Sequence, residues 1–227
     1  FPRVRLGALA EAGFADVVDG DTDLDAVSVA GVRAESLSWT GRRRLGSSRV
    51  DDLAAASWSA PAASFVDSFL EGLEVTALDA AGSSWWNVTV TASRIGSAEL
   101  YDSTWRGVRF RRCKLGYLNL RGARLTDVEF ADCVITDLDL ARASATRVAF
   151  PGTRIGRLEP TGARLVDVDL RGAALDDVGD AEGLRGATIT TTQLLDLAPA
   201  LAARRGVLVD LGAGDRTPSA RCGSRRH

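Results

Sequence analysis

The chain has 227 residues, a formal net charge of −2 and a hydrophobic fraction of 45%. This balance gives no electrostatic reason to expect nucleic-acid or membrane binding, and no apolar run approaches the roughly 18 residues of a membrane-spanning helix. The length fits one elongated domain, and the abundance of Ala, Gly, Val, Asp and Arg is typical of a GC-rich bacterial, specifically actinobacterial, genome.

Residues 1–62 predict an N-terminal lead-in with about one partial coil and an irregular loop. Within it, apolar residues recur every five positions at Leu24, Val29, Ala34 and Trp39. The register found later in the chain, extended backwards over residues 41–62, would point Arg43 and Trp58 inward. We therefore expect an irregular loop or a poorly formed coil there.

Residues 63–189 carry the same five-residue period without a slip. From Phe65 to Leu175 every fifth residue is apolar, with Pro160 the one odd choice, and a small or aliphatic residue usually stands two positions before each. A period of five suits neither a continuous helix nor a continuous strand. It indicates short extended segments joined by corners, where glycines such as Gly107, Gly122 and Gly172 would tolerate unusual backbone angles.

A second period, of twenty residues, places like residues above one another. The sequence therefore predicts an all-β fold, a right-handed quadrilateral parallel β-helix with about 20 residues per coil and a filled interior. Its predicted core ladders are Val88, Val108, Val128, Val148 and Val168; Phe110, Phe130 and Phe150; and Ile95, Leu115, Ile135 and Ile155.

The units Gly122-Ala123-Arg124-Leu125-Thr126 and Gly162-Ala163-Arg164-Leu165-Val166 resemble the pentapeptide repeat, a small residue followed by Asp or Asn, Leu or Phe, and two variable polar residues. Here Arg, Asp or Glu often precedes the central residue instead. The resemblance implies the β-helix fold but says little about function. Members of that family include proteins that protect DNA gyrase against quinolones by imitating DNA in shape and charge.

Residues 190–211 predict a capping helix and a short strand. Thr190 and Gln193 fit a capping box, and Leu194, Leu197 and Leu201 share one face of the helix that follows. A helix there would cover the open end of the last coil. The short strand is expected at Val207–Val209. These apolar residues are candidate cap or homodimer contacts: Leu194, Leu197, Leu201, Val207 and Val209. Residues 212–227 are expected to be disordered.

One basic segment, from Arg106 to Lys114, could suggest a nucleic-acid surface. The register argues against it, because Trp105 and Phe110 point inward and Glu129 lies one coil from Arg109. Between residues 63 and 189 there are 18 acidic and 15 basic residues, far from the dense negative charge of DNA. No nucleic-acid partner is expected, and DNA mimicry becomes an alternative.

The residues for catalysis are sparse. The single histidine is His227, at the last position, and no Cys/His grouping has the spacing of a metal site. Cys113 and Cys133 occupy inward positions twenty apart and are expected to be reduced core residues, with a disulfide between coils as the alternative. We expect no catalytic residue, no metal and no cofactor.

The sequence thus favours a non-enzymatic, cytoplasmic protein-binding or scaffold module. Its protein partner is unidentified, and a homodimer through the C-terminal region is expected. The alternative is a DNA-mimicking protector or inhibitor of DNA gyrase, of the quinolone-resistance type.

Overall fold

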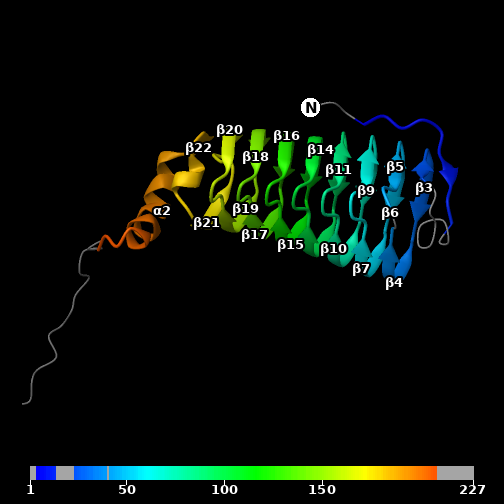
Figure 1. Ribbon diagram of the computed structural model, residues 1–227, viewed down its shortest axis with the longest axis horizontal. Helices are drawn as coiled ribbons and strands as arrows, with labels where there is room; N and C mark the ends of the chain where they lie inside the picture. Colours follow the sequence, from blue (N-terminus) through cyan, green and yellow to red (C-terminus); the bar gives the residue numbers. More distant parts are fainter. Residues whose placement is uncertain (1–3, 14–22, 40, 209–227) are drawn as a thin grey trace, which may run out of the picture.

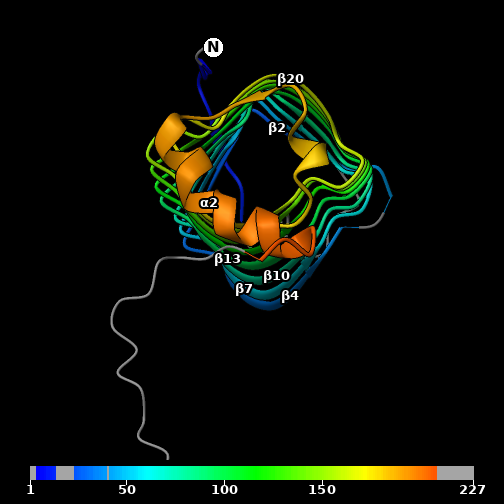
Figure 2. The ribbon, with the colours of Figure 1, turned by 90° about the vertical axis from the view of Figure 1, so that its left-hand side faces the viewer.

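The computed structural model describes residues 4–13, 23–39 and 41–208, which form a long parallel β-solenoid closed at one end by a helix (Figure 1). Every strand pairing is parallel. Figure 2, which looks along the solenoid from the helical end, shows coils of similar outline lying one behind another. The predicted parallel β-helix and its capping helix are confirmed.

The strands form two sheets that share the four sides of the solenoid. The larger sheet covers two sides and contains β1 (Ala10–Glu11), β2 (Leu24–Asp25), β3 (Val27–Ala30), β5 (Arg44–Gly46), β6 (Arg49–Asp51), β8 (Ser64–Val66), β9 (Phe69–Glu71), β11 (Ser84–Trp86), β12 (Thr89–Thr91), β14 (Thr104–Arg111), β16 (Arg124–Ala131), β18 (Ser144–Ala149), β20 (Arg164–Asp169) and β22 (Ala187–Thr188). The smaller sheet contains β4 (Arg33–Ser38), β7 (Ala54–Ser59), β10 (Glu74–Asp79), β13 (Arg94–Glu99), β15 (Lys114–Asn119), β17 (Val134–Asp139), β19 (Arg154–Glu159) and β21 (Ala174–Val178).

Residues twenty apart are neighbours across the coils. Val108 pairs with Val128, and Val128 with Val148, while Ile135 pairs with Leu115 on one side and Ile155 on the other. The structure buries every residue of the predicted ladders: Val88, Val108, Val128, Val148, Val168, Phe110, Phe130, Phe150, Ile95, Leu115, Ile135 and Ile155. Single coils cannot bury these side chains alone, so neighbouring coils stabilise one another.

Aromatic rings form a continuous column inside the solenoid. Phe110, Phe130 and Phe150 stack with centroids 5.2 Å apart at each step, and the Phe130 and Phe150 rings lie within 4° of parallel. Trp85 and Trp105 extend the column, with ring centroids 5.5 Å apart. Stacked rings of this kind add to the free energy gained from burying their area.

The segment from residue 41 to residue 62 differs from the expected irregular loop. It forms a complete coil through β5, β6 and β7, which pair with β8, β9 and β10. Ser38 pairs with Ser59, twenty-one positions on, whereas Leu45 pairs with Phe65, twenty positions on. One extra residue between Ser38 and Leu45 therefore shifts the phase of the repeat without interrupting the solenoid.

Arg43 and Trp58, which a regular coil over this segment would have to place inside, do point inward. Arg43 is 2% exposed, and its guanidinium carbon lies 4.8 Å from the centroid of the Trp39 ring. Trp58 is also buried, edge-on to Trp39 with centroids 5.1 Å apart. A cation–π contact compensates part of the cost of burying the arginine.

Helix α2 (Thr191–Arg204) lies across the open end of the last coil (Figure 2). Thr190 caps it, and the predicted capping box is present: Gln193 N–H donates to Thr190 Oγ1, and Thr190 N–H donates to Gln193 Oε1. Gln193 Nε2 also donates to the carbonyls of Leu170 and Ala173, each at 2.7 Å. One side chain thus joins the helix to the coil that it covers. A 3-10 turn (Glu182–Leu184) precedes it.

The expected strand after the helix is not formed by the residues that the structure describes there. Val207 and Leu208 have no regular structure, because Val207 N–H donates to the carbonyl of Ala202 at the helix end. Val209 and the tail at 212–227 lie outside the described residues.

At the opposite end, residues 4–13 run back along the coils and β1 pairs with β3 (Figure 1). This pairing covers part of the edge of the first coil. Among the described residues, no helix has both the length and the apolar character needed to cross a bilayer.

Candidate functional surfaces

The interior of the solenoid is filled with side chains. An internal cavity among the buried aromatic and aliphatic residues around Phe65, Trp85 and Phe110 measures about 10 Å³. This volume is about that of one water molecule. A ligand of any size must therefore contact the outer sides of the coils or their ends.

On the outside, arginine side chains are often paired with carboxylates of the same or the next coil. Arg147 binds Asp127 through two hydrogen bonds of 2.6 and 2.9 Å, in a column whose charges alternate in sign from Asp127 through Arg147 to Asp167. This contact lowers the pKa of the Asp127 carboxyl. Other pairs are Arg49–Glu71, Arg121–Asp139, Arg154–Asp176, Arg157–Glu159 and Arg171–Asp169.

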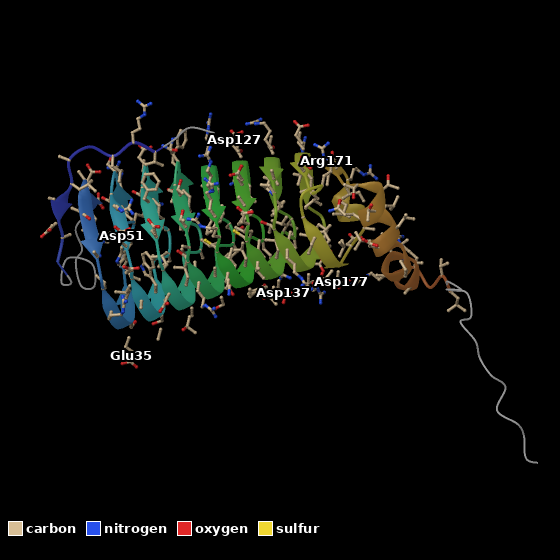
Figure 3. All side chains as sticks on the ribbon, turned by 180° about the vertical axis from the view of Figure 1, so that it is seen from behind. Glu35, Asp51, Asp127, Asp137, Arg171 and Asp177 are labelled. Atoms are coloured by element: carbon tan, nitrogen blue, oxygen red, sulfur yellow. The ribbon has the colours of Figure 1, made fainter. Side chains whose placement is uncertain are left out.

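In a second column of alternating charge, Asp137, Arg157 and Asp177, the arginine pairs outside the column. Asp137 and Asp177 lie along the same edge of the solenoid (Figure 3), and Arg157 stands between them in the register. Arg157 nevertheless pairs with Glu159, at 3.5 Å. Asp177 accepts two hydrogen bonds from Arg204 of α2, at 2.8 and 2.9 Å, and so helps to hold the cap in place.

One outer side differs from the rest. We call it the Trp86 face and define it by the outward positions of the first side: Ser64, Val66, Ser84, Trp86, Thr104, Arg106, Arg124, Thr126, Ser144, Thr146, Arg164 and Val166. None of these residues is acidic. Three are arginines, and most of the others carry hydroxyl groups, so the face combines positive charge with hydrogen-bonding capacity.

Trp86 is the aromatic residue of this face. Its side chain is 53% exposed, while the guanidinium carbon of Arg106 lies 4.9 Å from its ring centroid. The two residues lie beside a surface groove of about 590 Å³, which Ser84, Thr104 and Arg124 also line. An exposed tryptophan fixed by a cation–π contact is typical of a binding hot spot.

Another groove, of about 460 Å³, lies over β15, β17 and β19. Its central carboxylate, Asp139, is only 5% exposed and accepts hydrogen bonds from Arg121 Nε at 2.6 Å and from the Ala141 N–H at 2.9 Å. Burial and the charge of Asp139 raise the pKa of Tyr117 at its rim. The charges here compensate one another within the protein, unlike those of the Trp86 face.

The two inward cysteines are free thiols on adjacent coils. Cys113 donates to the carbonyl of Arg111 and Cys133 to that of Ala131, each at 3.3 Å. The contact with Cys113, together with burial, raises the pKa of the Cys133 thiol. Both act as small core residues. Cys222 and His227 lie outside the described residues, within which no group of three His, Cys, Asp or Glu side chains could hold a metal ion.

The candidate residues of the C-terminal region divide into two sets. Leu197 is buried and Leu201 is half-buried against the core, so both belong to the cap. Leu194 and Val207 are more than half exposed. Leu195 and Leu208 were not among the predicted contacts. They are exposed to 67% and 98% and enlarge the apolar surface that Leu194 and Val207 form.

Sequence reasoning did not identify Trp86 and Arg106 as a surface pair. The sequence nevertheless contains the information: Trp86 follows the inward Trp85, Arg106 follows the inward Trp105, and Trp86 and Arg106 are twenty positions apart. An aromatic residue directly after an inward position must point to solvent in this register.

Comparison with known proteins supports the repeat assignment. A family model described as pentapeptide repeats matches residues 106–144 in eight copies. Among solved structures, the chain is similar to full-length QnrB1, a plasmid-mediated fluoroquinolone resistance protein, at 13% identity and a TM-score of 0.38 over 88% of this chain and 97% of that one.

It is also similar to HetL, a pentapeptide-repeat protein involved in heterocyst differentiation regulation from the cyanobacterium Nostoc sp. strain PCC 7120. The identity is 16% and the TM-score 0.23, over 74% of this chain and 90% of that one. No curated protein matches the chain by sequence. Residues 106–144 are thus a run of pentapeptide repeats, and the twenty-residue register of that segment continues into the coils on either side of it.

Proposed function

We propose that this protein is a non-enzymatic binding module whose outer sides dock a protein partner. The observation that carries the proposal is the half-exposed Trp86, fixed by Arg106 on a mostly polar face. Exposed, rigid aromatic and arginine side chains contribute most of the binding energy in many protein interfaces. The filled interior directs any ligand to such outer surfaces.

Affinity capture from the source cell tests this proposal. The immobilised full-length chain should retain a specific protein in defined stoichiometry, and purified partner should bind it reversibly in calorimetry. Retention of no specific protein, under conditions in which the chain is folded by circular dichroism, would contradict it.

We also propose a homodimer through the exposed apolar residues of the cap, Leu194, Leu195, Val207 and Leu208. A second copy would remove these side chains from water. Light scattering of the full chain should give twice the monomer mass, and Leu195→Glu should return it to the monomer mass. Thr192→Glu, at an exposed polar position of the same helix, is the matched control. A monomer at high concentration would contradict the dimer.

Protection or inhibition of DNA gyrase by DNA mimicry is a second candidate function. One column favours it, in which Asp79, Glu99, Asp139 and Glu159 occupy the same position on the smaller sheet, interrupted by Asn119. Carboxylates repeated at about 4.8 Å could replace a line of phosphates. A supercoiling assay with purified gyrase decides the matter, because no effect at micromolar protein excludes it.

A further inference from the structure

We infer that the Trp86 face binds an acidic segment of a protein partner. This segment would lie on the face as a single chain in an extended or irregular conformation. This inference rests on the proposed protein-binding function and specifies the chemistry of the partner. It begins with the charges of the face. Arg106, Arg124 and Arg164 are exposed there, and none forms an ion pair within the described part of the chain.

The acidic residues closest to this face lie at its two corners, Asp102 at one and Asp67, Asp127 and Asp167 at the other. Asp127 is held by Arg147, and Asp67 accepts a 2.6 Å hydrogen bond from Asn87. The outward positions of the smaller sheet, by contrast, include many carboxylates, several of them paired with arginines. The outward positions of the Trp86 face thus carry three arginines and no carboxylate, and a carboxylate-bearing partner complements that charge.

The dimensions of the face favour one chain over a nucleic-acid duplex. The outward positions before and after each inward residue are two residues apart, so the basic strip is only about 7 Å wide. Arg106 and Arg164 are three coils apart, about 14 Å along the axis, which is the length of about four extended residues. The corner aspartates border this strip and would repel the phosphates of anything wider.

The setting of Trp86 also favours protein over single-stranded nucleic acid. Base stacking requires a free ring face. Arg106 lies over the ring of Trp86, and the register places Val66 at the equivalent position of the preceding coil. With these neighbours along its column, the half-exposed ring lies beside the groove, where it fits an aliphatic side chain next to the acidic residues.

The experiment uses the full chain and a fluorescein-labelled nonapeptide with one leucine followed by glutamate at every second position. Fluorescence anisotropy should show binding that weakens when NaCl rises from about 50 to about 300 mM, because salt screens exposed charges. Arg124→Glu with Arg164→Glu should weaken binding at least about tenfold, and Trp86→Thr should weaken it several-fold. Thr already occupies the Trp86 column at Thr126 and Thr146.

The matched control is Arg94→Glu, which reverses an exposed arginine at the same repeat position on the smaller sheet. It should leave binding unchanged, and circular dichroism should show that all variants fold. Equal binding by wild type and the double variant would overturn the inference, as would no binding of the peptide by wild type. Tighter binding of an oligothymidine than of the acidic peptide, through the same arginines, would also overturn it.

Failure of this inference is distinguishable from failure of the proposed function. If a purified partner protein binds the wild type and the Arg124→Glu, Arg164→Glu variant equally, the binding module stands and the assigned face is wrong. If no protein binds either, both proposals fail.

Discussion

Trp85 and Trp105 occupy the same buried column on neighbouring coils but differ in one hydrogen bond. Trp85 Nε1 donates to Ser83 Oγ at 2.8 Å, whereas Trp105 Nε1 has no partner among the described residues. Replacing either ring by phenylalanine leaves a similar void. At Trp85 the change also removes the hydrogen bond to Ser83, and the buried Ser83 hydroxyl loses that donor. At Trp105 no such bond is lost.

We therefore predict that Trp85→Phe lowers the free energy of unfolding by about 1 kcal/mol more than Trp105→Phe does. Urea unfolding followed by far-ultraviolet circular dichroism measures the difference, with each variant as the other's control. An equal or greater loss for Trp105→Phe would contradict this assignment.

The corners of the coils use more residue types than glycine. Gly107, Gly122, Gly152 and Gly162 have φ between +63° and +67°, as their placement at corners predicts, but Gly172 does not adopt a positive φ. Asp, Ala, Arg, Asn and Ser take left-handed angles at other corners. The sequence pattern could not predict which corners are left-handed, because the side chains there point to solvent and follow no period.

This finding predicts a stabilising substitution at Ala92, an exposed corner residue with φ of +50° in the column of Gly72 and Gly152. Ala92→Gly should raise the free energy of unfolding by about 0.5–1 kcal/mol, because glycine adopts left-handed angles without strain. Ala77→Gly is the matched control in an exposed strand position and should lower it by about 0.5–1 kcal/mol. Thermal unfolding of both variants that showed the same sign would refute the prediction.

The Asp127–Arg147 pair makes stability depend on pH. Hydrogen bonding to Arg147 lowers the pKa of the folded Asp127 below its unfolded value, so the unfolded chain binds more protons between the two values. The contribution is complete above the unfolded pKa, near 3.9, and is lost as the pH falls through the folded pKa.

Arg147→Gln should accordingly lower the urea midpoint at pH 7, and this difference should shrink as the pH falls and the Asp127 carboxyl becomes protonated in the folded state as well. Asp127→Asn should behave in the same way. A midpoint difference that persists unchanged into acid would show that the arginine acts through packing.

At the level of elements, the cap depends on Gln193, which closes the capping box and donates to two carbonyls of the last coil. Gln193→Ala should destabilise α2 locally by about 2 kcal/mol. Hydrogen exchange of the helix amides should accelerate while that of the central coils stays unchanged. Thr192→Ala, at the exposed neighbouring position, is the control and should not accelerate exchange.

The elements that sequence patterns predicted best are those in which inward positions are apolar in every coil, as at Val108, Val128 and Val148. The coil over residues 41–62 was missed for a physical reason. It follows a one-residue insertion and places Arg43 and Trp58 inside, where a charged group is normally too costly. The stacking of the Arg43 guanidinium on the Trp39 ring compensates part of that cost, and such a contact cannot be read from a five-residue pattern of apolar residues.

The candidate surface was predictable only in part. The register tells which residues point outward, so Trp86 and Arg106 could have been assigned to solvent. Which arginines lack an ion pair depends on side-chain geometry across coils, as Arg157 shows by pairing with Glu159 instead of Asp137 or Asp177.

At the scale of the whole molecule, each coil contacts mainly the coils before and after it. A solenoid of this kind should tolerate the loss of one complete coil, because the residues on either side of the gap carry the same pattern. The fold therefore depends on the twenty-residue register, that is, on the alignment of successive coils, more than on the identity of any one residue.

Deletion of residues 126–145 tests that claim most directly. It joins Leu125 to Thr146, which pairs with Thr126 in the intact protein, and so restores the register. We predict that this chain retains the β-sheet circular dichroism spectrum and unfolds cooperatively, whereas deletion of residues 126–143, two fewer, abolishes both. An unfolded twenty-residue deletion, or an eighteen-residue deletion as stable as it, would contradict the account.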